Sequence, residues 1–213
     1  MKKANKILVT RLYRYRDAIY RMKYMGLVKV FSENIADAVG VTSSQVRKDF
    51  SLFKLSGNKR GGYVIDDLLK KMNESLGKNR TQDVIIVGCG HIGTALKLYK
   101  GFEKKGIRIV AGFDIDESKV TRDAKVPILP FQELSQFIKT KKIKIGILAV
   151  PETAAQQVLD QMVQAGIEGI LNFAPMRLSH QENVVVNNVN LGLELETIIY
   201  FVGEIEKKQY EEK

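Results

Sequence analysis

A glycine motif between an apolar run and a helical pattern constrains this chain more than any other feature. Residues 83–87 (Asp-Val-Ile-Ile-Val) predict a buried strand, and Gly-Cys-Gly-His-Ile-Gly follows at 88–93. In this setting the first glycine permits a tight turn and the second lets a pyrophosphate approach the backbone. The third lets helix and strand pack closely. The free N–H groups at the helix start then face the anion.

An acidic residue stands where such a site needs one. Residues 107–113 predict a second strand that ends in Asp114, 21 residues beyond Gly93. A carboxylate there can accept a hydrogen bond from an adenosine ribose 2′-OH and repels the 2′-phosphate of NADP. The spacing therefore favours NAD as the ligand.

Strand and helix patterns alternate beyond this point. Residues 131–140 and 152–165 are helical in periodicity, and 143–150 and 167–173 are apolar strand runs. This alternation predicts an α/β fold with a doubly wound, mainly parallel sheet of the Rossmann type. The strand ends lie at the ligand crevice in such folds. The residues expected there are Val150, Pro151, Asn172 and Phe173.

The positive charge is confined to the N-terminal part of the chain. Residues 1–80 hold 18 Lys and Arg against 7 Asp and Glu, whereas residues 81–213 hold 16 against 17. A polar stretch at 77–81 marks the boundary. A segregated basic charge favours an acidic partner such as nucleic acid, and the alternative is a bias that only serves solubility.

The basic part has the pattern of a helix-turn-helix. Residues 9–25, 33–39 and 43–53 show helical periodicity, with Ser32 expected to cap the second helix and Gly40 to form the turn. The third helix presents one apolar face. Its opposite face carries cationic and hydroxyl side chains, which suit phosphate and base-edge contacts in a major groove.

A glycine-flanked Lys-Arg pair follows the third helix. Residues 56–64 predict the wing of a winged helix with Lys59 and Arg60 at its tip. An arginine at such a tip can enter a narrow minor groove. The alternative is a solvated hairpin whose basic tip has no role.

Several classes of protein are disfavoured. No apolar run approaches the ~20 residues that a membrane span requires, and the N-terminus lacks the apolar core of a signal peptide. One cysteine, Cys89, permits no internal disulfide, and two histidines are too few for an ordinary zinc site. We therefore expect a cytoplasmic protein without a metal.

The last helix is expected over about 193–208. It carries too much apolar surface to remain free, so it must complete its own subunit or dock into a second one.

Together these segments resemble the redox-sensing transcriptional repressors of the Rex family across nearly the whole chain. The most specific matches are residues 45–51, 87–93, 113–116, 149–151 and 169–175. The resemblance implies a homodimer that binds a palindromic double-stranded DNA operator and exchanges its C-terminal helix between subunits. It also implies that NADH releases the protein from DNA, whereas NAD⁺ permits binding.

The predicted organisation is a winged-helix domain at 1–78, a Rossmann domain at 79–190 and a dimerisation helix at 191–213. The residues predicted to contact DNA are Arg11, Ser44, Gln45, Arg47, Lys48, Ser51, Lys59 and Arg60. The residues predicted to bind the dinucleotide are Gly88, Cys89, Gly90, His91, Ile92, Gly93, Asp114, Tyr99, Val150, Pro151, Asn172, Phe173 and Asn190.

The chain departs from the family pattern at three positions. Asp17 stands at the position of the family's usual Arg, and Asn190 at that of its usual Asp. In the family these two charges are thought to pair across the dimer and to sense the charge of the nicotinamide. His91 replaces an Asn or Arg. We therefore expect altered discrimination between NADH and NAD⁺.

Two other functions remain open. An NAD-dependent dehydrogenase needs an acid or base near the nicotinamide, and neither Tyr99 nor His180 belongs to a recognisable catalytic set. We therefore expect that the protein is not an enzyme. The second alternative is a DNA-binding protein whose Rossmann domain serves only as a dimerisation scaffold.

Overall fold

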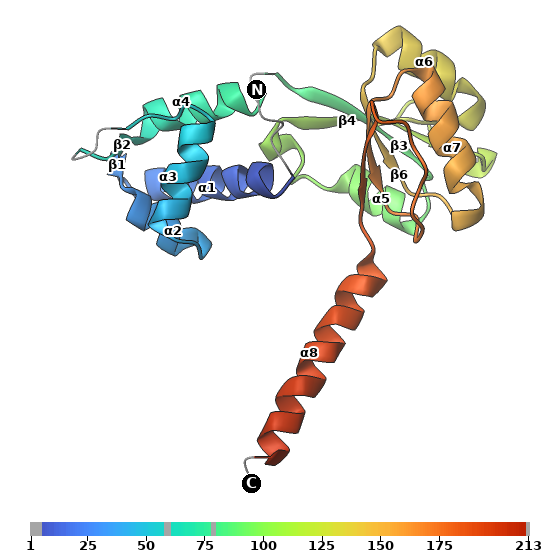
Figure 1. Cartoon of the computed structure of the whole chain (residues 1–213). Helices are drawn as coiled ribbons and strands as arrows, with labels where there is room; N and C mark the ends of the chain where they lie inside the picture. The colour runs from blue at the N-terminus through green and yellow to red at the C-terminus, as the bar shows by residue number, and fades with distance from the viewer. Residues whose placement is uncertain (1–5, 58–60, 78–79, 212–213) are drawn as a thin grey trace. The chain divides into compact units, whose positions relative to one another are not determined.

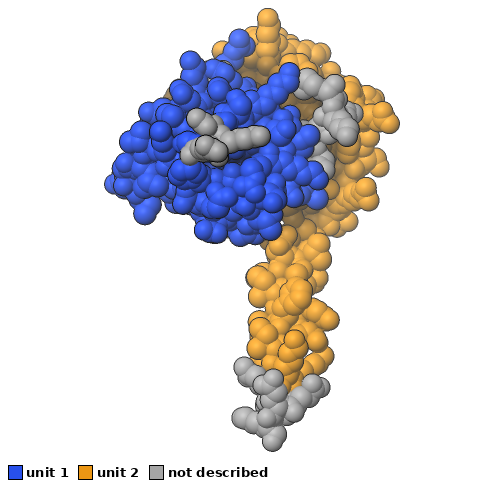
Figure 2. All heavy atoms as spheres, turned by 60° about the vertical axis from the view of Figure 1, so that its left-hand side comes forward, with its two compact units in different colours: residues 1–80 blue, residues 81–213 orange. Residues whose placement is uncertain are grey.

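The computed structural model describes residues 6–57, 61–77 and 80–211, and contacts divide the chain into two compact units, 1–80 and 81–213. Figure 1 shows the elements along the chain, and Figure 2 colours the two units separately. The residues predicted as the wing tip, Lys59 and Arg60, lie outside the described residues.

Unit 1 is a small helical domain with one short ladder. Its elements are α1 (Lys6–Tyr24), β1 (Lys29–Val30), α2 (Ser32–Val39), α3 (Ser43–Leu52), β2 (Tyr63–Val64) and α4 (Ile65–Ser75). The apolar stripe of α1 forms because Leu12, Tyr15 and Ile19 recur at helical spacing, and all three are buried in one core with α3 and α4.

One local detail of this unit differs from the sequence prediction. Ser32 is the first residue of α2, not its cap, and the side chain of Asn34 accepts the Phe31 N–H at 2.9 Å instead. The strand β2, which follows the predicted wing, pairs antiparallel with β1. Gly62, with φ of +66°, lies so close to the Val30 carbonyl that a side chain there would clash.

Unit 2 is a parallel sheet flanked by helices, which confirms the predicted α/β class. Its strands are β3 (Gln82–Val87), β4 (Ile107–Asp114), β5 (Ile128–Pro130), β6 (Ile145–Leu148), β7 (Gly169–Asn172) and β8 (Val185–Asn188). Their order is β5-β4-β3-β6-β7-β8, and every neighbouring pair is parallel. The connections therefore run to opposite sides of β3, so the ligand crevice of the fold lies between β3 and β6.

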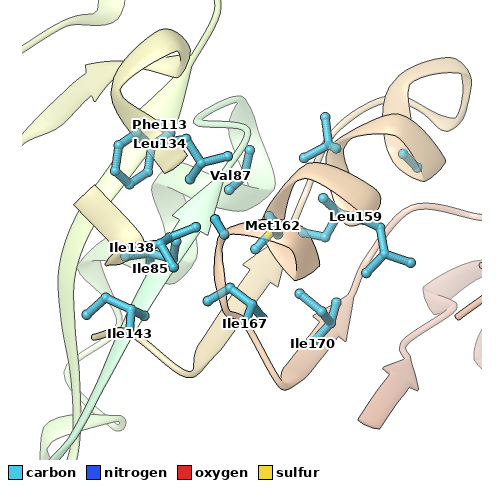
Figure 3. Close-up of a cluster of buried hydrophobic side chains, with 14 of the residues drawn as sticks. Ile85, Val87, Phe113, Leu134, Ile138, Ile143, Leu159, Met162, Ile167 and Ile170 are labelled. Atoms are coloured by element: carbon cyan, nitrogen blue, oxygen red, sulfur yellow. The ribbon is translucent and has the colours of Figure 1, made fainter. Parts of the chain in front are cut away.

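Apolar side chains cover both faces of the sheet. Ile85 and Val87 of β3 face a core shared with α6 (Leu134–Lys141) and α7 (Glu152–Ala165), which Figure 3 shows. Val84 and Ile86 face the opposite side, where Leu96 of α5 (His91–Leu98) packs. A strand buried on both faces is typical of parallel sheets.

The last helix, α8 (Leu191–Glu211), keeps its apolar side chains exposed. Leu195, Ile199 and Phe201, for example, are 59–69% exposed. Within the described residues, none of the large apolar side chains of α8 is buried.

Candidate functional site

The turn between β3 and α5 can be built only with glycine at two of its three positions. Gly88 has φ of +92°, and a Cβ atom there would collide with the carbonyl group of Ala149. A Cβ atom on Gly93 would overlap the carbonyl oxygen of Gly88. The two glycines thus bring α5 against β3 and β3 against the end of β6.

The middle glycine has a different environment. Gly90 is the N-cap of α5, and a Cβ atom there would meet nothing within 4 Å. The first N–H groups of a helix have no partner within that helix. Gly90 therefore borders open space beside unbonded donors, which is the arrangement that a pyrophosphate requires.

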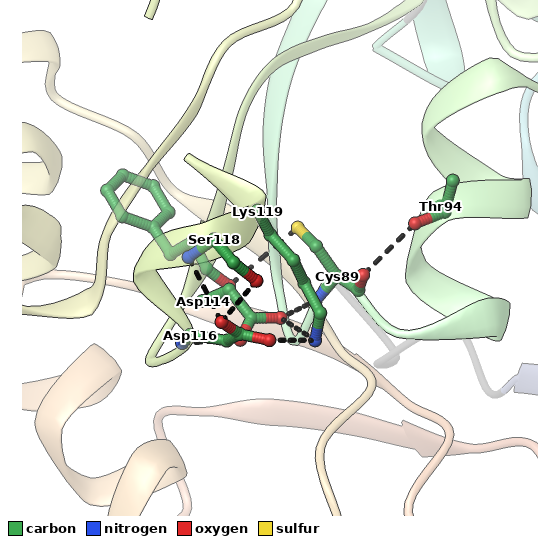
Figure 4. A network of polar contacts seen from close by, with 7 residues as sticks. Cys89, Thr94, Asp114, Asp116, Ser118 and Lys119 are labelled. Carbon is green, nitrogen blue, oxygen red and sulfur yellow. Dashed lines mark hydrogen bonds and ion pairs between the residues drawn. The ribbon is translucent and has the colours of Figure 1, made fainter. Parts of the chain in front are cut away.

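Asp114, the last residue of β4, ties this turn to the sheet (Figure 4). Its carboxylate is 8% exposed and accepts the N–H of Cys89 at 2.8 Å and the N–H of Asp116 at 2.9 Å. Lys119 Nζ lies 3.3 Å from Oδ2. Because Oδ1 accepts only one of these bonds, it retains a lone pair for a sugar hydroxyl.

The charge of Asp114 is secured by the same contacts. Burial alone raises the pKa of this carboxyl, but the N–H groups of Asp116 and Cys89 and the Lys119 ammonium outweigh burial and lower the pKa. Asp114 is therefore ionised at neutral pH and suited to accept a ribose hydroxyl.

Cys89 fills space rather than offering a reactive thiol. It is 3% exposed, and its Sγ lies where a side chain on Gly112 would have to go. Burial, and then the charge of Asp114, raise the pKa of the thiol. A raised pKa disfavours the thiolate that redox chemistry needs.

The remaining residues predicted for the dinucleotide site lie at the same edge or beside it. His91 and Pro151 are exposed, Val150 and Phe173 are half-buried, and Ile92 is 42% exposed. Tyr99 follows α5 and is 60% exposed, with its ring edge-on to Phe102 at 5.0 Å, so it is not a core residue. The exposed side chains are available to a ligand.

Two of the predicted ligand residues also have hydrogen-bond partners within the protein. Asn172 is fully buried, and its amide bonds Asn188 Oδ1 at 2.9 Å, Met176 O at 3.0 Å and Ala174 N at 2.9 Å. Its Oδ1 accepts one of these bonds, from the Ala174 N–H, and the predicted contact of this side chain with a dinucleotide stays a prediction. Asn190 caps α8, because its Oδ1 accepts the Leu193 N–H at 3.0 Å.

In unit 1, α3 has the face predicted for nucleic acid. Thr42 caps it by accepting the Gln45 N–H at 3.1 Å, and Val46 and Phe50 are buried. Ser44, Arg47, Lys48 and Ser51 are exposed. Arg47 is oriented by Glu33 at 3.0 Å and Ser43 at 3.2 Å.

Arg11 does not belong to this outer face. Its guanidinium makes two hydrogen bonds to Asp49 of α3, at 2.6 and 2.8 Å, and Tyr15 Oη donates to the same carboxylate at 2.9 Å. Arg11 thereby joins α1 to α3, and its predicted contact with DNA stays a prediction. Asp49 was not singled out from the sequence. The only sign of its role was one acidic residue among the otherwise apolar, inward-facing residues of α3.

Asp49 is 1% exposed and ionised. Burial raises the pKa of its carboxyl, but hydrogen bonds from Arg11, Tyr15 and Gln45 outweigh burial and lower the pKa. Burial and the neighbouring Asp49 raise the pKa of Tyr15 to about 12. Asp49 and these three side chains form one satisfied polar network.

The residue one place before Asp17 is also buried. Arg16 is 6% exposed and donates to Asp17 at 3.2 Å, with its guanidinium 5.0 Å from the Tyr13 ring centre. Its Nε has no hydrogen-bond partner among the described residues.

In the described ranges, no group of three or more His, Cys, Asp or Glu residues is arranged to hold a metal ion. None of the described helices combines the length and apolar content that a bilayer crossing requires.

Two family models match the chain. The model described as "CoA binding domain" matches residues 79–176, and the model described as "Putative DNA-binding protein N-terminus" matches residues 6–51.

Curated relatives match over nearly the full length. The redox-sensing transcriptional repressor Rex of Desulforamulus reducens is 40% identical over 200 residues, covering 93% of this chain and 95% of that protein. Rex of Thermosipho africanus is 36% identical over 200 residues, covering 93% and 96%.

Solved structures match equally well. The crystal structure of RSP in complex with β-NAD⁺ and operator DNA gives a TM-score of 0.91 at 31% identity, covering 99% of this chain and 97% of that one. The crystal structure of RSP in complex with β-NADH gives 0.84 at 31% identity, covering 99% of each chain.

Proposed function

The chain belongs to the Rex family of redox-sensing transcriptional repressors, and from this premise we propose that it binds a palindromic DNA operator as a homodimer and senses NADH and NAD⁺. One observation carries the proposal. A single chain joins a basic helix-turn-helix unit to a parallel sheet whose glycine turn and ionised Asp114 suit a dinucleotide.

The DNA surface that we propose is the exposed face of α3 together with the wing. Exposed cations and hydroxyls on a second helix suit a major groove. The proposed contacts are Ser44, Gln45, Arg47, Lys48, Ser51, Lys59 and Arg60.

The dinucleotide would lie across the carboxyl ends of β3 and β6. The N–H groups of residues 90–93 would bind its pyrophosphate, and Asp114 its adenosine ribose. Val150, Pro151 and Phe173 would border the crevice, and Tyr99 and Asn190 would lie toward the nicotinamide. The bound nucleotide would be either NADH or NAD⁺, and the protein would respond to which of the two forms it holds. We propose no catalytic step, since the relatives are repressors.

The dimer interface that we propose is the segment 191–213, which contains α8. A helix with this much exposed apolar surface is stabilised when a second subunit covers it. Residues 1–78 and 79–190 would form the DNA-binding and dinucleotide-binding domains. Because its partners are DNA and the pyridine nucleotide pool, we place the protein in the cytoplasm.

Asp17 and Asn190 are expected to reduce the discrimination between NADH and NAD⁺. Asn190 offers no carboxylate to the positive nicotinamide of NAD⁺, and Asp17 replaces the arginine that would pair with one. The double variant Asp17→Arg/Asn190→Asp should therefore raise the ratio of the two dissociation constants. Isothermal titration calorimetry with both nucleotides measures this ratio. An unchanged ratio would mean that Asp17 and Asn190 do not affect the discrimination between NADH and NAD⁺.

Replacing Asp114 should change the choice of nucleotide. Asp114→Asn removes the charge that accepts the ribose hydroxyl, and a hydrogen bond to a charged group contributes about 1.5–3 kcal/mol. The affinity for NADH should fall roughly 10- to 100-fold, whereas that for NADPH falls less. Asp116→Asn is the matched control, because the Asp116 side chain is exposed and contacts Ser118 and Lys119, whereas only its backbone N–H meets Asp114. Equal losses for both nucleotides would contradict the ribose assignment.

The proposed function is tested by measuring DNA binding, which depends on unit 1, and nucleotide binding, which depends on unit 2. Full-length protein would select duplexes from a random DNA pool, and fluorescence anisotropy would measure affinity against salt. A protein that neutralises about 6–10 phosphates loses roughly 10³- to 10⁵-fold in affinity between about 50 and 200 mM salt. A flat salt response would contradict the DNA-binding unit, and no binding of either nucleotide would reduce the Rossmann unit to a scaffold.

A further inference from the structure

Hydrogen bonds from two sides hold the main chain of Cys89 in the glycine turn (Figure 4). Its N–H donates to Asp114 Oδ2 at 2.8 Å, and its carbonyl oxygen accepts a hydrogen bond from Thr94 Oγ1 at 3.1 Å. Asp114 ends β4, whereas Thr94 lies in the first turn of α5 and is half-buried. Cys89 is therefore tied both to the sheet and to the helix that follows it.

The bond from Thr94 determines the direction of the peptide group between Cys89 and Gly90. In a planar trans peptide the C=O and N–H bonds point in opposite directions. Because the Cys89 carbonyl points toward the Thr94 hydroxyl, the Gly90 N–H points away from that hydroxyl. Gly90 is exposed, and within the described residues its N–H donates to no acceptor. This donor is therefore available to a ligand at the turn.

The backbone at Gly90 does not hold this orientation by itself. Turning the peptide over changes the φ angle of Gly90, which is −71°, and glycine adopts positive φ about as readily as negative φ. A Cβ atom on Gly90 would meet nothing within 4 Å, so the space beside this residue is open. Among the described residues, the Cys89 carbonyl accepts no backbone N–H. The Thr94 hydroxyl is thus the group that favours one orientation of the peptide.

We propose that Thr94 is a positioning residue of the pyrophosphate site, which holds the Cys89 carbonyl so that the Gly90 N–H faces the pyrophosphate. In the opposite orientation the site would lose this donor, and a carbonyl oxygen would face the negatively charged phosphate oxygens. A hydroxyl has one proton to donate, and the Thr94 hydroxyl donates it to Cys89. Thr94 thus acts through the peptide, without donating to the phosphate itself. The inference rests on the proposed binding of NADH and NAD⁺.

The first test measures NADH affinity by calorimetry in full-length variants of Thr94. Thr94→Val keeps the shape of the side chain and removes the hydroxyl. NADH affinity should fall by about 5-fold or more, because the hydrogen bond at stake is one to a charged group. Thr94→Ser keeps the hydroxyl and should bind NADH as the wild type does. Thr140→Val changes an exposed threonine on α6 in the same way and is the control, with unchanged affinity.

The second test observes the Cys89–Gly90 peptide itself by nuclear magnetic resonance. Cys89 is the only cysteine of the chain, and Gly90 follows it directly. Isotope labelling of the cysteine carbonyl carbon and the glycine nitrogen therefore gives one carbonyl–amide cross-peak, which belongs to this peptide. In the wild type, NADH should shift the Gly90 amide resonances. In nucleotide-free Thr94→Val the Cys89 carbonyl resonance should move, because the carbonyl loses its hydrogen bond, whereas in Thr94→Ser it should not.

The outcomes separate this inference from the function it rests on. If the wild type binds neither NADH nor NAD⁺, the proposed nucleotide sensing fails and the inference falls with it. If the wild type binds NADH and the Gly90 amide resonances do not move, the inference alone is overturned. It is also overturned if Thr94→Val binds NADH as tightly as the wild type, or if Thr94→Ser binds it as weakly as Thr94→Val. The same holds if the Cys89 carbonyl resonance is unchanged in Thr94→Val.

Discussion

Replacing Gly93 with alanine is expected to weaken the binding of NADH and NAD⁺ and to destabilise the Rossmann unit together. The new Cβ atom would overlap the carbonyl oxygen of Gly88, and the backbone must separate to relieve the overlap. Overpacking of this kind costs about 1–3 kcal/mol. Because the displaced residues form the turn that receives the pyrophosphate, nucleotide affinity should fall roughly 10- to 100-fold. Calorimetric titration and thermal unfolding measure the two effects.

Gly90→Ala is the matched comparison for this experiment. A Cβ atom at Gly90 meets open space, so the protein should unfold at the temperature of the wild type. The same methyl group stands where the pyrophosphate must approach, so nucleotide affinity should still fall. Wild-type affinity in both variants would show that the dinucleotide does not bind at this turn.

Replacing Asp49 with alanine is expected to destabilise the DNA-binding unit more than any other single change to its polar residues. The substitution leaves Arg11, Tyr15 and Gln45 without the carboxylate that they share. Breaking a buried ion pair costs about 3–5 kcal/mol. For a unit of this size, about 3 kcal/mol lowers Tm by at least about 10 °C. Thermal unfolding followed by circular dichroism measures the shift, and Asp37→Ala, an exposed acid on α2, is the control.

The pH dependence of stability follows from the same carboxylate. The folded pKa of Asp49 is lowered, so its contribution is fully present above the unfolded pKa of about 3.9 and is lost as pH falls through the folded value. Part of the acid destabilisation of the wild type should therefore be absent from Asp49→Ala. The double variant Arg11→Met/Asp49→Leu should recover much of the lost stability, because an apolar pair needs no partners. A Tm for Asp49→Ala equal to that of Asp37→Ala would contradict the role of the network.

Elements bounded by strong local signals were predictable from the sequence. The helix α7 has the predicted bounds, 152–165, because Pro151 precedes it and Gly166 ends it. The glycine turn was predictable because Gly88 and Gly93 each have a local steric reason, and Gly90 leaves open space at the start of α5. The strands β5 and β8 were missed. Each is short and lies at an edge of the sheet, and β8 ends in Asn187 and Asn188, which lack strand propensity.

Side chains whose partners are distant in sequence were not predictable. Arg11 has the charge of a DNA contact, and only the packing of α1 on α3 brings it to Asp49, 38 residues away. Asn172 stands at a strand end, where ligand contacts are common, but β8 supplies Asn188 as its partner. In both cases the residue type indicated a polar role, and the fold decided which polar group it meets.

Nucleotide bound to the Rossmann unit is expected to control the affinity of the helix-turn-helix unit for DNA. The most direct test is the anisotropy of a labelled, selected duplex in complex with the full-length protein, titrated with NADH. Saturating NADH is expected to weaken DNA binding by at least about 5-fold, the lower end of ordinary allosteric coupling. Gly90→Ala should need far more NADH for the same effect. An unchanged DNA affinity at an NADH concentration shown by calorimetry to saturate the site would contradict the claim.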